Sequence, residues 1–340
     1  MNLPRNSHRR LFRRVHVLPS LLTLGNFSCG FISIVLCLNA LFFSTRAQLM
    51  DEGTPGISVA AVAALPATGA SLTTEETRAQ AMQSPSGNRR RAGYLFHWAC
   101  VFIFFGMLFD VLDGKVARAM GASSAFGTEL DSLADATSFG IAPAIIVNTL
   151  SLSVMPATYA WWTQVILFGV IFAICAVLRL ARYNIQSGVA DKNIFSGLPS
   201  PAAAGCVVSA VLFLEGNYAC VDVVCSWFAG NDFLGQDAAQ VKARLLSFFL
   251  LVPGLLMVST VPFSHLANRY FTGKKSFTIL VLAVLLVALI WYEPRFMLFL
   301  CFNGYLLIGL VGAARNLLRG RPATVNYGAP EQAADEEEEL

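Results

Sequence analysis

The chain has 340 residues, of which 56% are hydrophobic and only 13% are charged, with a formal net charge of +3. Soluble domains carry about 25% charged residues, so this composition excludes an ordinary soluble protein and indicates an integral membrane protein. The charge pattern also lacks the basic face of a nucleic-acid-binding protein, and we expect no nucleic acid among the partners.

The N-terminal part of the chain predicts a basic segment followed by a membrane helix. Residues 1–17 contain five arginines, which suits a cytoplasmic segment beside anionic membrane lipids. Residues 18–43 form an apolar run, and a bilayer span needs about 20 such residues. No small-residue cleavage site follows it, so we expect a retained helix. Residues 44–94 are rich in Ala, Ser, Thr, Gly and Pro and predict a flexible loop insert.

The remaining spans are predicted in chain order from hydropathy. They cover residues 95–118, 127–150, 158–181, 198–217, 243–263, 276–292 and 296–314. Together they predict an all-α, polytopic membrane helix bundle within residues 18–320, followed by a disordered acidic C-terminal tail over residues 321–340.

The distribution of basic residues predicts the orientation of the bundle. An even number of spans places both termini on one side, and the positive-inside rule makes that side cytoplasmic. Arg89, Arg90 and Arg91 fall on the other side and argue against this orientation. However, long loops are translocated largely regardless of their charge.

The cysteines give no clear redox signature. Six of the eight lie in apolar stretches and are expected to behave as small hydrophobic residues. Cys220 and Cys225 share one predicted loop, and a disulfide between them requires that this loop face an oxidising compartment.

Four aspartates interrupt the second and third predicted spans. They lie in the pattern DxxDGxxAR, eight residues, then GxxxDxxxD, formed by Asp110, Asp113, Gly114, Ala117, Arg118, Gly127, Asp131 and Asp135. An unpaired charge within a membrane segment costs roughly 3 kcal/mol, so such residues usually face a polar cavity and have a function. Four carboxylates cannot stay ionised together without a cation between them. The pattern therefore predicts a metal site inside a membrane protein.

Helical spacing places the aspartates on two faces that can meet. Asp110 and Asp113 are three residues apart, and Asp131 and Asp135 are four apart, so each pair shares one face of its helix. A short turn around residues 119–126 would bring these faces together. Hard oxygen ligands in this number suit Mg²⁺, Mn²⁺ or Ca²⁺ rather than zinc.

The residues beside the aspartates indicate a diphosphate site. Gly114, Gly127 and Ala117 are small enough for a large ligand to approach the backbone, and Arg118 can donate to phosphate oxygens. Because the site faces acyl chains, we expect a lipid that carries a nucleotide diphosphate. Asp135 is the best candidate for a base that accepts a proton from an incoming hydroxyl. The alternative is an ion-coupled transporter in which the aspartates bind ions or relay protons.

At every defined position this pattern resembles the signature of the CDP-alcohol phosphatidyltransferase family. The resemblance implies a six-helix membrane core, here with about two extra C-terminal helices, and two divalent ions, Mg²⁺ or Mn²⁺. It implies that Asp110, Asp113 and Asp131 are metal ligands, and that Asp135 is a ligand that also acts as the catalytic base. The positions implied to bind the CDP moiety are Asp110, Gly114, Ala117, Arg118 and Gly127.

Further segments are similar to the bacterial-type phosphatidylserine synthases within that family. These segments are residues 18–26, 131–144, 179–184 and 195–203, and the whole resemblance covers about residues 18–43 and 95–265. It implies phosphatidyl transfer from CDP-diacylglycerol to L-serine at the cytoplasmic face of a bacterial inner membrane, with membrane lipids around the protein. Homodimers are common in the family.

A serine acceptor would need a cation for its carboxylate near the catalytic base. A guanidinium group fits a carboxylate in a way that an ammonium group does not. We therefore expect an acceptor pocket formed by Arg179, Arg182, Asn184 and Ser200. Other family members use a glycerol-3-phosphate or inositol-type acceptor, and this is the alternative to serine.

Overall fold

The computed structural model describes nine stretches of the chain. They are residues 17–52, 84–120, 125–154, 159–186, 194–216, 218–230, 237–259, 262–264 and 292–318. The α-helices in these stretches are α2 (Val17–Glu52), α5 (Pro85–Ala119), α6 (Ala125–Asp135), α7 (Ala142–Val154), α8 (Tyr159–Gln186), α9 (Ser200–Leu214), α10 (Ala219–Phe228), α11 (Ala238–Phe249), α12 (Leu251–Val258) and α15 (Pro294–Leu318). A π-helix, η2 (Ala136–Ile141), joins α6 to α7.

Strand structure in the described residues is limited to one small ribbon. Strands β1 (Ile194–Ser196) and β2 (Pro262–Ser264) pair antiparallel, with Phe195 opposite Phe263. The predicted all-α class is therefore confirmed apart from this two-stranded ribbon, which hydropathy did not indicate.

Six segments of the described chain are helical, long and apolar enough to cross a membrane. They are Leu18–Asp51, Pro85–Ala119, Phe126–Val154, Thr163–Ile185, Ala238–Val258 and Pro294–Arg315, and α9 is a shorter apolar helix. This confirms a multi-pass membrane bundle. The span predicted over residues 276–292 lies outside the described residues, except for its last residue.

The loop predicted over residues 44–94 is wrong at both of its ends. α2 continues to Glu52 because residues 44–52 contain good helix formers and neither Gly nor Pro. α5 begins at Pro85, where the Ser84 hydroxyl accepts the Gly87 N–H at 3.1 Å and caps the helix. Hydropathy predicted only the membrane-buried parts of these helices. Residues 53–83, 1–16 and 321–340 lie outside the described residues.

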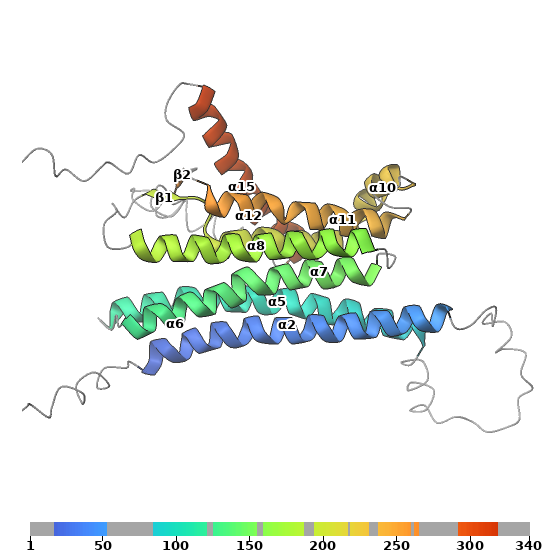
Figure 1. Ribbon diagram of the computed structural model, residues 1–340, viewed down its shortest axis with the longest axis horizontal. Helices are drawn as coiled ribbons and strands as arrows, with labels where there is room; N and C mark the ends of the chain where they lie inside the picture. The colour runs from blue at the N-terminus through green and yellow to red at the C-terminus, as the bar shows by residue number, and fades with distance from the viewer. Residues whose placement is uncertain are drawn as a thin grey trace, which may run out of the picture.

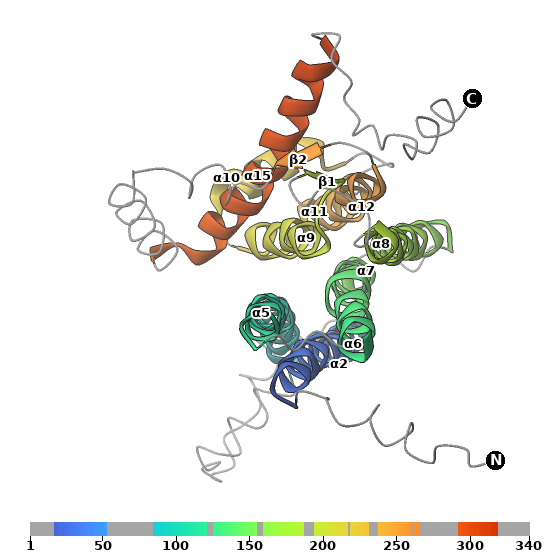
Figure 2. The same cartoon turned by 90° about the vertical axis from the view of Figure 1, so that its left-hand side faces the viewer.

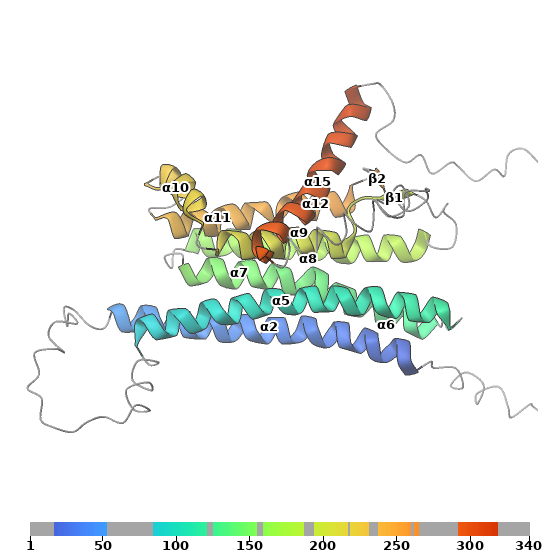
Figure 3. The same ribbon diagram turned by 180° about the vertical axis from the view of Figure 1, so that it is seen from behind.

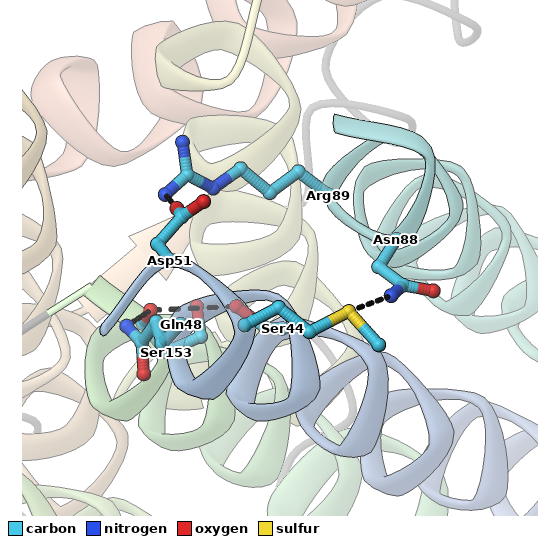
Figure 4. Close-up of polar contacts among 7 residues, drawn as sticks. Ser44, Gln48, Asp51, Asn88, Arg89 and Ser153 are labelled. Atoms are coloured by element: carbon cyan, nitrogen blue, oxygen red, sulfur yellow. Dashed lines mark hydrogen bonds and ion pairs between the residues drawn. The ribbon is translucent and has the colours of Figure 1, made fainter. Parts of the chain in front are cut away.

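Polar contacts tie the extended ends of α2 and α5 to their neighbours (Figure 4). Arg89 of α5 forms an ion pair with Asp51 of α2. Gln48 of α2 donates to the Ser153 carbonyl, near the end of α7, at 2.7 Å. These contacts explain why the helices continue past their apolar segments.

The long helices run side by side, and only α15 is strongly inclined to them (Figures 1 and 3). Seen along the bundle, the continuous α6–η2–α7 rod lies between α2 and α8 (Figure 2). A Cβ atom on Gly30 of α2 would lie 2.4 Å from the Ser138 hydroxyl of η2, so only glycine allows this approach. The start of α2, α6 and the β ribbon lie at one end of the bundle, and α10 lies at the other.

Pro143 accounts for the π-helix in the central rod. In a regular α-helix the proline ring would clash with the carbonyl four residues earlier. The helix instead includes one more residue between donor and acceptor, so that the Ala142 N–H donates to the carbonyl of Thr137, five residues earlier. Such turns are frequent at functional sites, and this one begins directly after Asp135.

The segment directly before α9, residues 194–199, packs against the end of α12. Gly197 has a φ of +87°, and a Cβ there would lie 2.5 Å from the Met257 carbonyl. The next N–H, of Leu198, donates to the Leu256 carbonyl at 3.0 Å. The end of α8 and the start of α9 are therefore both held at the same end of the bundle as α6.

Candidate active site

α5 and α6 bring three of the four aspartates together. Asp110, Asp113 and Asp131 each offer one carboxylate oxygen, and these three atoms lie within 4.8 Å of one another. α5 ends at Ala119 and α6 begins at Ala125, so both helices stop within the turn predicted around residues 119–126, of which residues 121–124 lie outside the described residues. The two acidic helix faces meet as the spacing predicted.

This carboxylate trio fits a divalent cation. Asp113 Oδ2 and Asp131 Oδ1 are buried, and neither forms a hydrogen bond with any described residue. Buried oxygens without partners cost free energy, and neighbouring carboxylates repel one another. A hard cation would compensate both costs, because all the ligand atoms in the group are carboxylate oxygens.

Asp135 lies outside this trio and is held from α2. Its side chain is only 9% exposed, and its Oδ1 accepts a hydrogen bond from Asn26 Nδ2 at 3.1 Å. The fourth aspartate is thus positioned by a neutral donor, one helical turn beyond Asp131.

Asn26 is a site residue that the sequence analysis did not single out. It is fully buried, and its backbone carbonyl accepts a hydrogen bond from the Ser138 hydroxyl at 2.9 Å. It therefore joins α2 to the last turn of α6 and to η2. A polar residue in the middle of an apolar span was the signal that could have identified it.

Replacing Asn26 with Leu is expected to lower kcat about 10- to 100-fold while the KM for the lipid donor changes little, because Asp135 loses the donor that orients it. Steady-state kinetics of the purified variant would test this. Asn39→Leu is the matched control, because Asn39 lies on the exposed side of the same helix and donates only to the Val35 carbonyl of its own helix. An unchanged kcat in folded Asn26→Leu protein would contradict the role.

The residues predicted to bind the acceptor separate into two groups. Arg179 interacts electrostatically with Asp110 and Asp135, and its Nη1 donates to the Ser200 hydroxyl at 2.6 Å. In contrast, Arg182 Nη1 donates to the Val258 carbonyl at the end of α12, at 3.0 Å. Arg179 and Ser200 therefore border the acidic site, whereas Arg182 is engaged in capping a helix.

Asn184 also reaches the acidic helix. Its Nδ2 donates to the Ser132 hydroxyl of α6 at 2.9 Å, next to Asp131. α8 is thereby tied to α6 beside Asp131. Ser132 itself was not predicted as a site residue.

The residues predicted to bind CDP lie near the end of α5 and the start of α6. A Cβ on Gly114 would meet only the Arg118 guanidinium, at 3.9 Å, so this face of α5 is open. Arg118 is exposed, whereas Ala117 and Gly127 are half-buried. The arrangement leaves room for a ligand beside the carboxylate trio.

Comparison with known proteins agrees with this geometry. A family model described as CDP-alcohol phosphatidyltransferase matches residues 56–231, a range that contains all four aspartates. The chain belongs to the CDP-alcohol phosphatidyltransferase family. It is therefore an enzyme, a phosphotransferase, and the transporter alternative is excluded. The family uses a divalent metal, in agreement with the ligand set of this phosphatidyltransferase.

Relatives of this phosphatidyltransferase carry names that specify an acceptor. A CDP-diacylglycerol–serine O-phosphatidyltransferase of Helicobacter pylori is 30% identical over 226 residues, which cover 65% of this chain and 81% of the relative. The Bacillus subtilis protein of the same name is 38% identical over 112 residues, 33% of this chain and 59% of the relative. An archaetidylserine synthase of Methanothermobacter thermautotrophicus is 39% identical over 122 residues, which cover 35% of this chain and 48% of the relative.

The segment predicted as a loop around Cys220 and Cys225 forms helix α10 instead. Cys225 lies in α10 as a free thiol, and it is 2% exposed. It packs with Val221 and Val241 in a small apolar cluster, so its role in the phosphatidyltransferase is that of a buried hydrophobic residue.

Proposed function

We propose that the protein transfers the phosphatidyl group of CDP-diacylglycerol to the hydroxyl of L-serine, giving phosphatidylserine and CMP in phospholipid biosynthesis. The observation that carries this proposal is the meeting of the carboxylate trio, Asp135 and the Arg179–Ser200 pair at one end of the bundle. The names of the relatives support serine as the acceptor.

The donor would bind between the ends of α5 and α6. Asp110, Asp113 and Asp131 would hold Mg²⁺ or Mn²⁺, in one or two sites, and the metal would neutralise charge that develops on the diphosphate. Arg118 would donate to phosphate oxygens, and Gly114 would let the nucleotide lie against the backbone. Ala117 and Gly127 keep the same surface free of large side chains.

Asp135 would accept the proton of the serine hydroxyl. Asn26 donates to its Oδ1, so Oδ2 would be the oxygen that accepts this proton. The deprotonated serine oxygen takes the phosphatidyl group, and CMP leaves with the electrons of the broken P–O bond. We also retain Asp135 as a candidate ligand of a second metal ion.

Arg179 is the cation that we assign to the serine carboxylate. Arg179→Lys is expected to raise the KM for serine about tenfold, because a lysine cannot form the paired hydrogen bonds of a guanidinium. The KM for CDP-diacylglycerol should change less than twofold, by the same argument. Kinetics with each substrate varied in turn would measure this. Arg182→Lys is the comparison, because a lysine can also donate to the Val258 carbonyl that Arg182 contacts. Equal effects of Arg179→Lys on both KM values would contradict the assignment of Arg179.

We place the active site at the cytoplasmic face of a bacterial inner membrane. Lys115, Arg118, Arg179 and Arg182 lie toward the end of the bundle that holds the aspartates, which supports this orientation by the positive-inside rule, whereas Arg89, Arg90 and Arg91 lie toward the other end and argue against it. A homodimer is part of the proposal, and light scattering of the purified protein would test it.

One assay tests the proposed reaction directly. Purified protein is mixed with CDP-diacylglycerol and one acceptor, and CMP release is measured with and without EDTA. We expect rapid release with serine, little with glycerol-3-phosphate or inositol, and none after EDTA. Faster release with another alcohol would retain the reaction class but overturn the acceptor.

A further inference from the structure

The end of the bundle away from the aspartates contains two neighbouring cavities. One, of about 530 Å³, lies among α2, α5, α7, α9 and α11, and the other, of about 500 Å³, lies among α5, α9 and α15. Both have Gly93, Phe96 and Glu215 in their walls. Phe96 is separated from Asp113 by about 25 Å along α5, at 1.5 Å per residue. These cavities are therefore distinct from the active site.

The two cations that line the larger cavity form ion pairs. Its Arg89 forms an ion pair with Asp51 (Figure 4), and its Lys242 pairs with Asp222 at 2.5 Å. The Ser153 carbonyl in its wall accepts hydrogen bonds from two side chains of α2. The cations of this cavity therefore already have partners within the protein.

The smaller cavity does not satisfy its polar groups. Arg90 and Arg295 line it, and neither guanidinium forms an ion pair within 4 Å with any residue that the structure describes. His97 Nδ1 is buried there and has no hydrogen-bond partner among the described residues. Glu215 adds one carboxylate, which interacts at longer range with Lys242 of the larger cavity and with Arg295. Within this set His97 Nδ1 is the buried atom, whereas Arg90 and Glu215 are exposed and Arg295 is half-buried. A buried polar atom normally has a partner, and a polar ligand with both signs of charge would give one to His97 and to the charged groups beside it.

Aromatic residues place this cavity at the membrane surface. Tyr94 and Trp98 of α5 are 63% and 37% exposed. Their rings pack edge to face, with 6.1 Å between the ring centroids. Tyr and Trp gather where the headgroups of a bilayer meet its hydrocarbon core. Further along α5, Phe105 and Leu108 are exposed apolar side chains, as expected within the hydrocarbon core. The mouth of the cavity is therefore level with lipid headgroups.

We propose that this cavity, lined by Arg90, His97, Glu215 and Arg295, binds the headgroup of an aminophospholipid in the leaflet away from the active site. The two guanidinium groups bind the phosphate, as charge-assisted donors do, and Glu215 faces the ammonium group. Phe96, Val211 and Leu212 line the same cavity and supply an apolar wall for the glycerol and acyl region. A volume of about 500 Å³ accommodates a group of that size.

The test measures lipid binding to the purified, delipidated full-length protein by native mass spectrometry. The probes are phosphatidylethanolamine, phosphatidylglycerol and inorganic phosphate. We expect phosphatidylethanolamine to bind most tightly, and Arg90→Gln/Arg295→Gln to weaken it about tenfold, which corresponds to 1.4 kcal/mol. Arg91→Gln/Arg315→Gln is the matched control, because it removes the same charges from the same two helices outside this cavity. Glu215→Gln should abolish the preference over phosphatidylglycerol.

Two results would overturn the proposal. One is equal lipid affinity of the two double variants. The other is binding of inorganic phosphate as tight as that of the lipid, which would indicate a free-anion site. CMP release by Arg90→Gln/Arg295→Gln should stay within about twofold of the unmodified protein, because the cavity is far from the aspartates. That readout confirms folding and keeps this test separate from the test of the proposed reaction.

Discussion

Asp131→Asn is expected to abolish phosphatidyl transfer, with kcat/KM reduced at least about 1000-fold, because it removes a charged ligand from the carboxylate trio. Asp131 Oδ1 is buried without a hydrogen-bond partner among the described residues, so no protein group replaces the cation there. The amide has nearly the same shape but supplies a weaker, neutral ligand. CMP release and calorimetric titration with Mn²⁺ would measure the two effects together.

Glu129→Gln is the matched control for this variant. Glu129 lies on the same helix, its side chain is exposed, and it is absent from the carboxylate cluster. The same change from carboxylate to amide should leave both metal affinity and turnover near their original values. If Asp131→Asn retained full Mn²⁺ affinity, the trio would not be the metal site.

Asp135→Asn is expected to reduce transfer about 100- to 10,000-fold, the usual contribution of a general base, while the protein still binds metal and CDP-diacylglycerol. The asparagine Oδ1 can still accept the hydrogen bond from Asn26, so the local geometry should be retained. The loss would then report the missing proton acceptor. Rapid-quench measurement of CMP formation, beside equilibrium binding of the donor, separates chemistry from binding.

The two aspartate variants distinguish a base from a ligand. If Asp135→Asn lost Mn²⁺ affinity to the same degree as Asp131→Asn, Asp135 would act mainly as a metal ligand. Appreciable transfer by Asp135→Asn with normal metal binding would remove it as the base. Asp135 lies apart from the trio in the structure, which favours its role as the base. Asn26 is then the residue that positions it.

Much of the fold followed from local patterns. Hydropathy located the apolar part of α2, α5, α8 and α15, because lipid exposure imposes a long apolar run on each span. It missed the ends of α2 and α5, which extend beyond the bilayer core and are held by polar contacts such as Arg89–Asp51. The β ribbon is three residues per strand, too short to leave a periodic signal.

The part of the candidate site that depends on residues close in sequence was predicted, and the part that depends on contacts between distant helices was not. Helical periodicity places Asp110 with Asp113 and Asp131 with Asp135, and a short turn brings the two pairs together. Arg179 and Arg182 are indistinguishable in sequence, since both are basic residues at the end of one span. Only the packing of α8 against α12 directs Arg182 to the Val258 carbonyl and leaves Arg179 beside the aspartates.

The sequence by itself determined the class of this protein and its chemistry: a helical membrane enzyme with four carboxylates at a spacing that requires a cation. Those features depend on composition and on periods of three or four residues, which the chain displays directly. The tertiary structure decided which aspartate stands apart and what holds it. Asn26 and Asp135 are 109 residues apart in sequence, and they meet only because Gly30 lets α2 pack directly against η2. The same packing of whole helices formed the distal cavity lined by Arg90 and Arg295, which no local pattern predicts.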